Sequence, residues 1–205
     1  MIAILDYGCG NLRSVSKALE YLGQETIVTG GAADVSRASH VILPGVGAFA
    51  DAMRLFRQSD NGGLESALLE AVALNKPVLG ICLGMQMLMS GSDEDGWHDG
   101  IGLFDAPVTR FPKDAGKVPH MGWNRITSRG CPLFDGVDGA YVYFVHSYRV
   151  EGVHDWTAAS SDYGSAFTAA VWHGNLFGAQ FHPEKSGEAG LRILKNFAEM
   201  RTRGC

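Results

Sequence analysis

The chain has 205 residues, a length that predicts one domain spanning residues 1–205. Apolar residues make up 46% and charged residues 19% of the sequence, a balance that excludes intrinsic disorder. The formal net charge is −5, and the 17 Lys and Arg form no dense run. Nucleic-acid binding, which needs clustered basic side chains, is therefore not expected.

No apolar stretch approaches the roughly 18–20 residues that a membrane-spanning helix needs, so no membrane association is expected. Residues 1–6 carry only a short apolar run without a basic flank, which does not fit a signal peptide. The sequence therefore predicts a cytoplasmic location. The four cysteines, Cys9, Cys82, Cys131 and Cys205, form no C-x-x-C pair, and we expect neither a metal site nor a cofactor.

Strand-like and helix-like segments alternate over the first half of the chain. Short apolar runs predict strands at residues 2–5, 25–28, 41–43 and 78–81. Apolar residues at helical spacing predict helices at residues 12–22, 48–56, 64–74 and 83–89. Asn11 is the expected N-cap of the first helix, and Gly23 is expected to end it. This alternation indicates βαβ units and a parallel sheet.

The second half changes character, because its segments are short, β-branched or aromatic, and separated by Gly, Asp and Pro. Strands are predicted at residue 118 and at residues 123–127, 141–145, 147–150, 166–172 and 176–181. The polar, glycine-containing residues 90–100 predict a surface loop, and residues 188–200 predict a final helix. We therefore expect an α/β fold with a mostly parallel central sheet and extra antiparallel strands in the second half.

Cys82 stands between a predicted buried strand and a predicted helix, in the segment G-I-C-L-G at residues 80–84. G-x-C-x-G is the cysteine form of the nucleophile elbow, a sharp turn that needs small flanking residues. A thiol at a helix N-terminus is stabilised as the thiolate by the helix dipole. The pattern indicates a nucleophile. A buried cysteine packed as a small apolar side chain is the alternative.

A cysteine nucleophile needs a base, and the base needs a group that orients it. His182 directly follows the last predicted strand, at residues 176–181, and Glu184 comes two residues later. Because α/β enzymes place catalytic groups at strand ends, Cys82, His182 and Glu184 form a candidate catalytic set. Taken singly, His182 fits an ordinary loop histidine and Glu184 a solvated carboxylate.

Acyl transfer also needs backbone N–H donors for an oxyanion. The segment P-G-V-G at residues 44–47 follows the third predicted strand, and its Gly45, Val46 and Gly47 can present such donors. The amide of Leu83, directly after the nucleophile, is the natural second donor. An ordinary glycine turn at residues 45–47 is the alternative.

Three separated motifs, P-G-V-G at 44–47, G-I-C-L-G-M-Q at 80–86 and F-H-P-E at 181–184, resemble the class I, or triad, glutamine amidotransferases in order and spacing. Three more stretches resemble the glutaminase subunits of imidazole glycerol phosphate synthase, a family of histidine biosynthesis. They are D-Y-G-C-G-N-L-R-S-V at 6–15, P-H-M-G-W-N at 119–124 and F-V-H-S-Y at 144–148. The resemblance covers nearly the whole chain and implies a flavodoxin-like three-layer sandwich.

By this resemblance, Cys82 attacks the side-chain amide of glutamine and forms a glutamyl thioester, which water then hydrolyses. His182 takes the thiol proton and passes it to the departing ammonia. The implied substrate contacts are Gln86 and the backbone of Ser147 and Tyr148. An acidic residue for the substrate ammonium is expected in residues 92–95, where Glu94 and Asp95 both fit.

The resemblance also implies a partner, because this family delivers ammonia to a cyclase subunit with a (β/α)8 barrel. That subunit makes imidazole glycerol phosphate and aminoimidazole carboxamide ribotide. Since the amidotransferase domain takes up all 205 residues, the cyclase must be a separate chain, and a heterodimer is expected. The residues that match family positions near the interface are Pro119, Met121, Trp123 and Lys185, with Asn11 and Arg13 as weaker candidates. For Trp123, a buried core position is the alternative.

Two other classes of function fit parts of the sequence. One is another class I glutaminase, such as the small subunit of anthranilate, carbamoyl phosphate or pyridoxal phosphate synthesis; the segments at 6–12 and 119–124 favour histidine biosynthesis instead. The other is a non-catalytic partner, which would be expected to lose a member of the catalytic set. A dinucleotide site at residues 8–10 is unsupported, because Arg13 replaces the third glycine of that motif.

Overall fold

The computed structural model describes residues 1–201, so Cys205 lies outside the described residues. Five strands at one side of the main sheet pair in parallel. In spatial order they are β2 (Thr26–Thr29), β1 (Ile2–Leu5), β3 (His40–Gly45), β4 (Val78–Cys82) and β14 (Leu176–Ala179). Because the carboxyl ends of parallel strands meet at one edge, the chain segments that leave β3, β4 and β14 lie side by side there.

The sheet continues with strands from the second half of the chain. After β14 come β13 (Ala166–His173), β11 (Tyr148–Glu151), β7 (Phe104–Arg110), β5 (Met89–Ser92) and β6 (His98–Asp99). Most of these pairs are antiparallel; β5 with β7 is parallel. On one side, β12 (Thr157–Asp162) pairs with β13 and with β9 (Thr127–Ser128).

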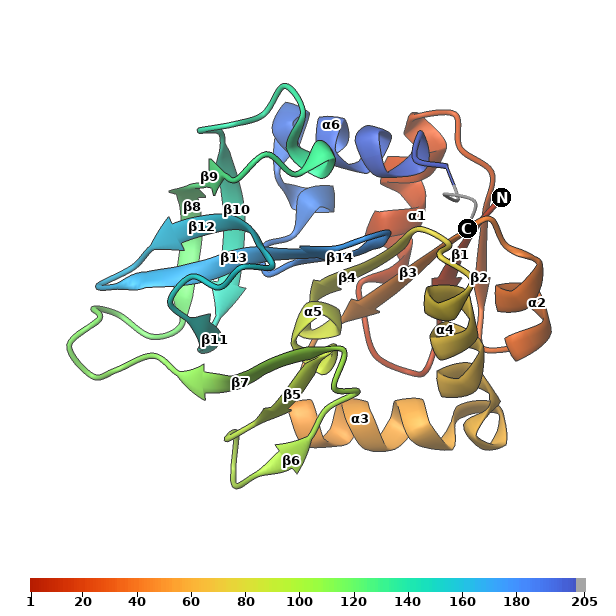
Figure 1. Cartoon of the computed structure of the whole chain (residues 1–205), viewed down its shortest axis with the longest axis horizontal. Coiled ribbons are helices and arrows are strands. Elements are labelled where there is room, and N and C mark those ends of the chain that lie inside the picture. The colour runs from red at the N-terminus through yellow and green to blue at the C-terminus, as the bar shows by residue number, and fades with distance from the viewer. Residues whose placement is uncertain (202–205) are drawn as a thin grey trace.

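A separate antiparallel pair, β8 (His120–Arg125) with β10 (Tyr141–His146), stands at the left of Figure 1. The amide of His182 donates a hydrogen bond to the Tyr143 carbonyl of β10 at 3.0 Å. This small sheet is therefore joined to the segment that follows β14.

Helices cover both faces of the parallel strands (Figure 1). One face carries α1 (Leu12–Tyr21) and α6 (Gly187–Ala198), and the other carries α2 (Ala32–Arg37), α3 (Phe49–Gln58) and α4 (Gly63–Ala73). The short elements are α5 (Leu83–Met87) and the 3₁₀ turns η1 (Ser59–Gly62), η2 (Pro132–Phe134) and η3 (Pro183–Lys185).

Side-chain alternation along the strands explains the two layers of helices. In β1, Ile4 packs into the same core as Leu19 and Phe197, while Leu5 packs into a second core with Phe49. Successive strand residues point to opposite faces, so an apolar run such as residues 2–5 contributes side chains to both cores. The result is the three-layer α/β sandwich that the sequence predicts.

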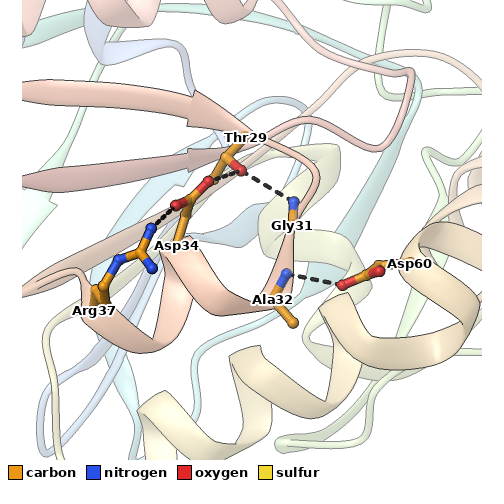
Figure 2. Close-up of polar contacts among 6 residues, drawn as sticks. All are labelled: Thr29, Gly31, Ala32, Asp34, Arg37 and Asp60. Carbon is orange, nitrogen blue, oxygen red and sulfur yellow. Dashed lines mark hydrogen bonds and ion pairs between the residues drawn. The ribbon is translucent and has the colours of Figure 1, made fainter.

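Helix α2 was not predicted from the sequence, and tertiary contacts hold its N-terminus (Figure 2). The Thr29 hydroxyl accepts a hydrogen bond from the Gly31 amide at 3.0 Å and donates one to Asp34 Oδ2 at 2.7 Å. Asp60 Oδ2, from η1, accepts from the Ala32 amide at 3.0 Å. A six-residue helix is unstable alone, so these contacts at its otherwise unpaired amides are what support it.

Three sequence predictions of local structure are wrong. The helix predicted at 83–89 ends at Met87, and Met89 already begins β5. The predicted loop at 90–100 forms the β5–β6 hairpin, because pairing of β5 with β7 recruits residues with weak strand propensity. Residue 118 precedes β8, which begins at His120. Asn11 is the N-cap residue of α1 as predicted, although it caps through its carbonyl and its side chain makes no capping hydrogen bond.

Candidate active site

Cys82 stands in the turn between β4 and α5, with φ 54° and ψ −109°. A positive φ is costly for a residue with a side chain and persists only when the surroundings impose it. A Cβ at Gly80 would lie 2.8 Å from the Gly84 carbonyl oxygen, and a Cβ at Gly84 would collide with the Leu43 carbonyl oxygen. The strained turn therefore depends on glycine at both positions.

His182 follows β14 and is held by Glu184 of η3. His182 Nδ1 and Glu184 Oε1 are 2.8 Å apart, and the two side chains are 2% and 0% exposed. Since Nδ1 binds Glu184, Nε2 is the nitrogen left for Cys82; it is buried and forms no hydrogen bond of its own. The geometry fits a base whose orientation is fixed by a carboxylate.

Opposing effects set the charge of this histidine. Burial lowers the pKa of His182, but the interactions with Cys82 and Glu184 together outweigh burial and raise it to about 9. His182 is therefore protonated near neutral pH when Cys82 is a thiolate. An imidazolium beside a cysteine sulfur favours the nucleophilic form of that cysteine.

A hydrogen-bonded link ties the His182 loop to β10. The Ser186 hydroxyl donates to the His182 carbonyl at 2.6 Å and accepts from the Tyr143 amide at 2.9 Å. The His182 amide donates to the Tyr143 carbonyl at 3.0 Å. No sequence pattern pointed to Ser186, because its role arises only when β10 and η3 meet.

A cavity of about 400 Å³ opens above Cys82, a volume that suits a small molecule. The residues that line it and were singled out from the sequence are Val46, Gly47, Cys82, Leu83, Gln86, Glu94, Pro119, Ser147, Tyr148, His182 and Lys185. Two other candidates lie beneath the surface: Gly45 packs closely to Leu83, and Glu184 is behind His182. The fold thus gathers side chains from widely separated segments at one strand edge.

The segment after β3 borders the nucleophile directly. Gly45 is the last residue of β3 and lies opposite Cys82 in the register of the β3–β4 pair. The backbone of Val46 and Gly47 continues along the cavity. The Tyr7 hydroxyl donates a hydrogen bond to the Pro44 carbonyl at 2.7 Å, which anchors the start of this segment. Tyr7 was not singled out by the sequence reasoning.

Gln86 and Glu94 are both tied to backbone atoms. Gln86 Nε2 donates to the Tyr148 carbonyl at 3.0 Å, and Glu94 Oε2 accepts from the Phe49 amide at 2.8 Å. Of the two acidic residues left open by the sequence, Glu94 lines the cavity and Asp95 does not. Glu94 is thus the carboxylate that a bound molecule would meet.

Of the predicted interface residues, Pro119 and Lys185 line the cavity, and Met121 and Trp123 lie on β8, which begins directly after Pro119. Met121 and Trp123 alternate along β8, so they share one face, and they are 60% and 55% exposed. The core alternative for Trp123 is therefore wrong. Pro119 and Lys185 are exposed at the cavity edge. The weaker candidates behave differently: Arg13 is exposed and Asn11 half-buried, both at the start of α1, which packs against η3.

A buried histidine pair, His120 and His146, lies close to the active site but differs from His182. The two rings are joined at 3.1 Å through His120 Nδ1 and His146 Nε2, and His146 Nδ1 donates to the Tyr148 carbonyl at 2.8 Å. Burial lowers the pKa of His120 to about 4 and that of His146 to about 3. Both are neutral near pH 7, which suits a structural role.

Within residues 1–201, no group of three or more His, Cys, Asp and Glu side chains is arranged to hold a metal ion. In the same part of the chain, no helix is long and apolar enough to cross a membrane.

The chain matches a known protein family over nearly its whole length. The profile of the family described as "Glutamine amidotransferase class-I" matches residues 3–200, so the chain is a class I glutamine amidotransferase by family. Within that class, the chain is 50% identical over 203 residues to "Imidazole glycerol phosphate synthase subunit HisH" of Methanosarcina acetivorans, covering 97% of this chain and 98% of the relative. It is 49% identical over 209 residues to HisH of Syntrophotalea carbinolica, covering 98% and 100%. The chain belongs to the HisH family.

Solved structures agree on the fold. One titled "Crystal structure of glutamine amidotransferase" has a TM-score of 0.75 at 19% identity and covers 97% of each chain. Another, titled "Structure of PurLQS from Thermotoga maritima", has a TM-score of 0.72 at 19% identity and covers 96% of each chain. The predicted fold class is confirmed.

Proposed function

We propose that this chain hydrolyses glutamine to glutamate and ammonia and supplies the ammonia to a cyclase subunit of imidazole glycerol phosphate synthase, in histidine biosynthesis. The observation that carries this proposal is the set of Cys82, His182 and Glu184 assembled at the strand edge of one cavity. Membership of the HisH family supports the choice of pathway.

In the proposed reaction, the Cys82 thiolate attacks the side-chain carbonyl carbon of glutamine. His182 gives the proton on Nε2 to the departing nitrogen, and ammonia leaves a glutamyl thioester. Water, deprotonated at the same Nε2, then attacks the thioester and releases glutamate. Glu184 keeps Nε2 directed at the reaction by accepting from Nδ1. Proton transfer of this kind contributes about 10²–10⁴-fold.

The negative oxygen formed in each tetrahedral intermediate needs preorganised donors. We assign this role to the amide of Leu83 and to backbone N–H groups of the segment Gly45, Val46 and Gly47. Their support is position: Leu83 follows the nucleophile, and Gly45 lies opposite Cys82 in the sheet register. One such donor is worth about 10²–10³-fold in rate.

Substrate binding is proposed for Gln86, Glu94, Ser147 and Tyr148, which all line the cavity. Glu94 would bind the α-ammonium group of glutamine, since it is the acidic side chain in the lining and its position is fixed by the Phe49 amide. Ser147 and Tyr148 would bind the amino-acid end through their backbone atoms.

Ammonia is useful only if it reaches the acceptor before water protonates it, so we propose direct docking of the cyclase, a (β/α)8 barrel, in a heterodimer. The proposed contact residues are Pro119, Met121, Trp123 and Lys185, with Asn11 and Arg13 at the margin. Exposed Met and Trp side chains on β8, the strand that follows the cavity-lining Pro119, support this face, because such residues are enriched in interfaces. We further propose one domain over residues 1–205 and a cytoplasmic location.

The test is glutamate release from glutamine by the purified chain. It is measured with the chain alone, with its cyclase partner, and with the cyclase plus its ribulosyl nucleotide substrate. A large rise in the last condition, with formation of imidazole glycerol phosphate, is the expected result.

Fast glutamate release without a partner would contradict the coupling to the cyclase and indicate a different glutaminase. Absence of release in all three conditions, while the complex still uses added ammonia, would indicate a non-catalytic subunit.

A further inference from the structure

Gln180 contacts both Gln86 and Cys82. It follows β14 directly, is fully buried, and is not part of the cavity lining. Its side-chain amide lies between two site residues: Oε1 accepts from Gln86 Nε2 at 2.9 Å, and Nε2 is 3.8 Å from the Cys82 sulfur. A buried amide in this place needs both of its ends satisfied.

The sheet places Gln180 beside the nucleophile. Ala179 lies opposite Ile81 in the parallel pair of β14 and β4, and Gln180 and Cys82 are the next residues of the two chain segments. The Gln180 amide donates to the Ala169 carbonyl at 2.9 Å, which continues the pairing with β13 one residue beyond β14. The chain then bends at Gln180 and Phe181 before it reaches His182.

The direction of the Gln180 amide follows from a backbone carbonyl. The Tyr148 carbonyl can only accept, so the group of Gln86 that faces it must be the NH₂. The second hydrogen of that NH₂ points to Gln180, so the Gln180 atom that faces it must be the acceptor Oε1. The Gln180 NH₂ is then directed at the Cys82 sulfur; the reverse orientation would set two N–H donors against each other.

We propose that Gln180 is a positioning residue that donates a hydrogen bond from Nε2 to the Cys82 sulfur and favours its thiolate, in an orientation fixed through Gln86 by the Tyr148 carbonyl. This inference rests on the proposed function, since it gives Cys82 the role of nucleophile. A thiol sulfur is a weak acceptor, whereas a charged acceptor forms markedly stronger hydrogen bonds. The same N–H therefore stabilises the thiolate more than the thiol.

The experiment measures the rate at which iodoacetamide alkylates Cys82 between about pH 5 and pH 10, because only the thiolate reacts. The full chain is used, and the Cys82 peptide is quantified by mass spectrometry so that the other cysteines do not interfere. Gln180→Met keeps the length of the side chain and removes the donor. Gln180→Glu keeps the shape and can still accept from Gln86, but it presents an oxygen to the sulfur.

The matched control is Asn175→Leu. Asn175 is also a buried amide, and it donates to the Asn75 carbonyl at 2.6 Å. It precedes β14, at the opposite end of the strand from Cys82. The Asn175→Leu substitution removes a buried hydrogen bond far from the Cys82 sulfur. Its alkylation profile therefore shows the effect of a general loss of stability on the reactivity of Cys82.

The expected order of the pH midpoints of alkylation is Gln180→Glu highest, then Gln180→Met, then wild type together with Asn175→Leu. The shift for Gln180→Met is expected to be about one pH unit. A midpoint of Gln180→Met that coincides with wild type would overturn the inference, as would an equal shift in Asn175→Leu. A shift in Gln180→Glu alone would show only repulsion by the new carboxylate, and would also overturn it. Thermal unfolding identifies the folded variants, and Gln180→Leu, which also lacks the donor, replaces Gln180→Met if that variant does not fold.

Kinetics of the complex with the cyclase give a second readout. Because Gln180 does not line the cavity, Gln180→Met should lower kcat for glutamine about tenfold and leave KM within about twofold. A change confined to KM would overturn the inference. The alkylation profile needs no glutaminase activity, so an inactive wild-type complex with shifted midpoints would refute the proposed function while supporting the role of Gln180.

Discussion

On the nucleophile side of the cavity the geometry is set by close steric contacts at two glycines, whereas on the base side it depends on hydrogen bonds between polar groups. Cys82 takes its backbone conformation from the glycines at 80 and 84, which let β4, α5 and β3 approach. His182 takes its position from Glu184 and from the Ser186 link to β10. Steric contacts thus determine the conformation of Cys82, and hydrogen bonds determine the position of His182.

The two sides are therefore sensitive to different kinds of substitution. Substitutions that add a single carbon should damage the nucleophile side, because no backbone atom there can give way. On the base side, substitutions should act by removing the orientation or the charge of His182, since His182 and Glu184 are buried polar groups.

Removal of the nucleophile has the largest expected effect. Cys82→Ala should lower glutamine-dependent synthesis by the complex by about 10⁴-fold or more, because no thioester can form. Ammonia-dependent synthesis should stay within about twofold, since the cyclase is untouched. Cys131→Ala, a buried cysteine outside the cavity, serves as the control. Retention of glutamine-dependent activity by Cys82→Ala would exclude the cysteine as nucleophile.

Glu184→Gln should weaken the base without removing it. We expect kcat for glutamine to fall about 10²–10⁴-fold with KM nearly unchanged, because the histidine loses the carboxylate that orients it. Glu184 is one of the two groups that raise the pKa of His182, so the imidazolium should also lose its proton at lower pH. Glutamate release by the complex across pH measures both effects. A loss as complete as that of Cys82→Ala would contradict an orienting role.

Gly84→Ala should test the steric side. A Cβ at this position collides with the Leu43 carbonyl oxygen, so the free energy of unfolding should fall by about 3 kcal/mol. Gly31→Ala is the matched control, because its φ is −98° and the added Cβ meets only ordinary contacts. The control should stay within about 0.5 kcal/mol of wild type in urea unfolding. Equal stability of the two variants would show that the elbow tolerates a side chain.

The smallest effect is the pH dependence of stability. The pKa values of His120 and His146 are lowered from 6.5 by burial, so the unfolded state binds protons first as the pH falls. The free energy of unfolding should therefore drop by about 2 kcal/mol between about pH 6.5 and pH 5. His146→Asn should flatten this slope, and the exposed His173→Gln should not. An unchanged slope in His146→Asn would argue against a neutral buried pair.

His182 acts in the opposite direction, because its pKa is raised to about 9. The stability that it contributes is fully present below about pH 6.5 and is lost as the pH rises toward 9. His120 and His146 thus lower the free energy of unfolding at acidic pH, and His182 lowers it at alkaline pH.

The parts of the fold that could be predicted from the sequence are those with strong local patterns. Helix α3 and strand β4 follow from apolar spacing, and the elbow follows from two glycines around Cys82. Strand β12, with the sequence Thr-Ala-Ala-Ser-Ser-Asp, has no such pattern and exists because β13 pairs with it. Local sequence patterns do not predict pairing between strands that are far apart in the chain.

The candidate site also contains residues that local motifs predict and one that they do not. Motifs located Cys82, His182 and Gln86, and a carboxylate near residue 94 was expected. Gln180 lay inside a predicted strand, where nothing in the sequence distinguishes a buried amide that faces a sulfur from a residue that only packs. Its relation to Gln86 and to the Tyr148 carbonyl arises only when residues 62 and 94 positions apart meet.

The way in which both ends of the described chain are fastened has a practical consequence. The Met1 carbonyl accepts from the Ser39 hydroxyl, and the Met200 carbonyl contacts His40 Nε2 at 2.9 Å, so both lie at the amino ends of the parallel strands. Cys82 and His182 lie at the carboxyl ends. A surface, a fluorophore or a fused protein attached at either end would therefore leave the cavity and the exposed face of β8 open to a docking subunit.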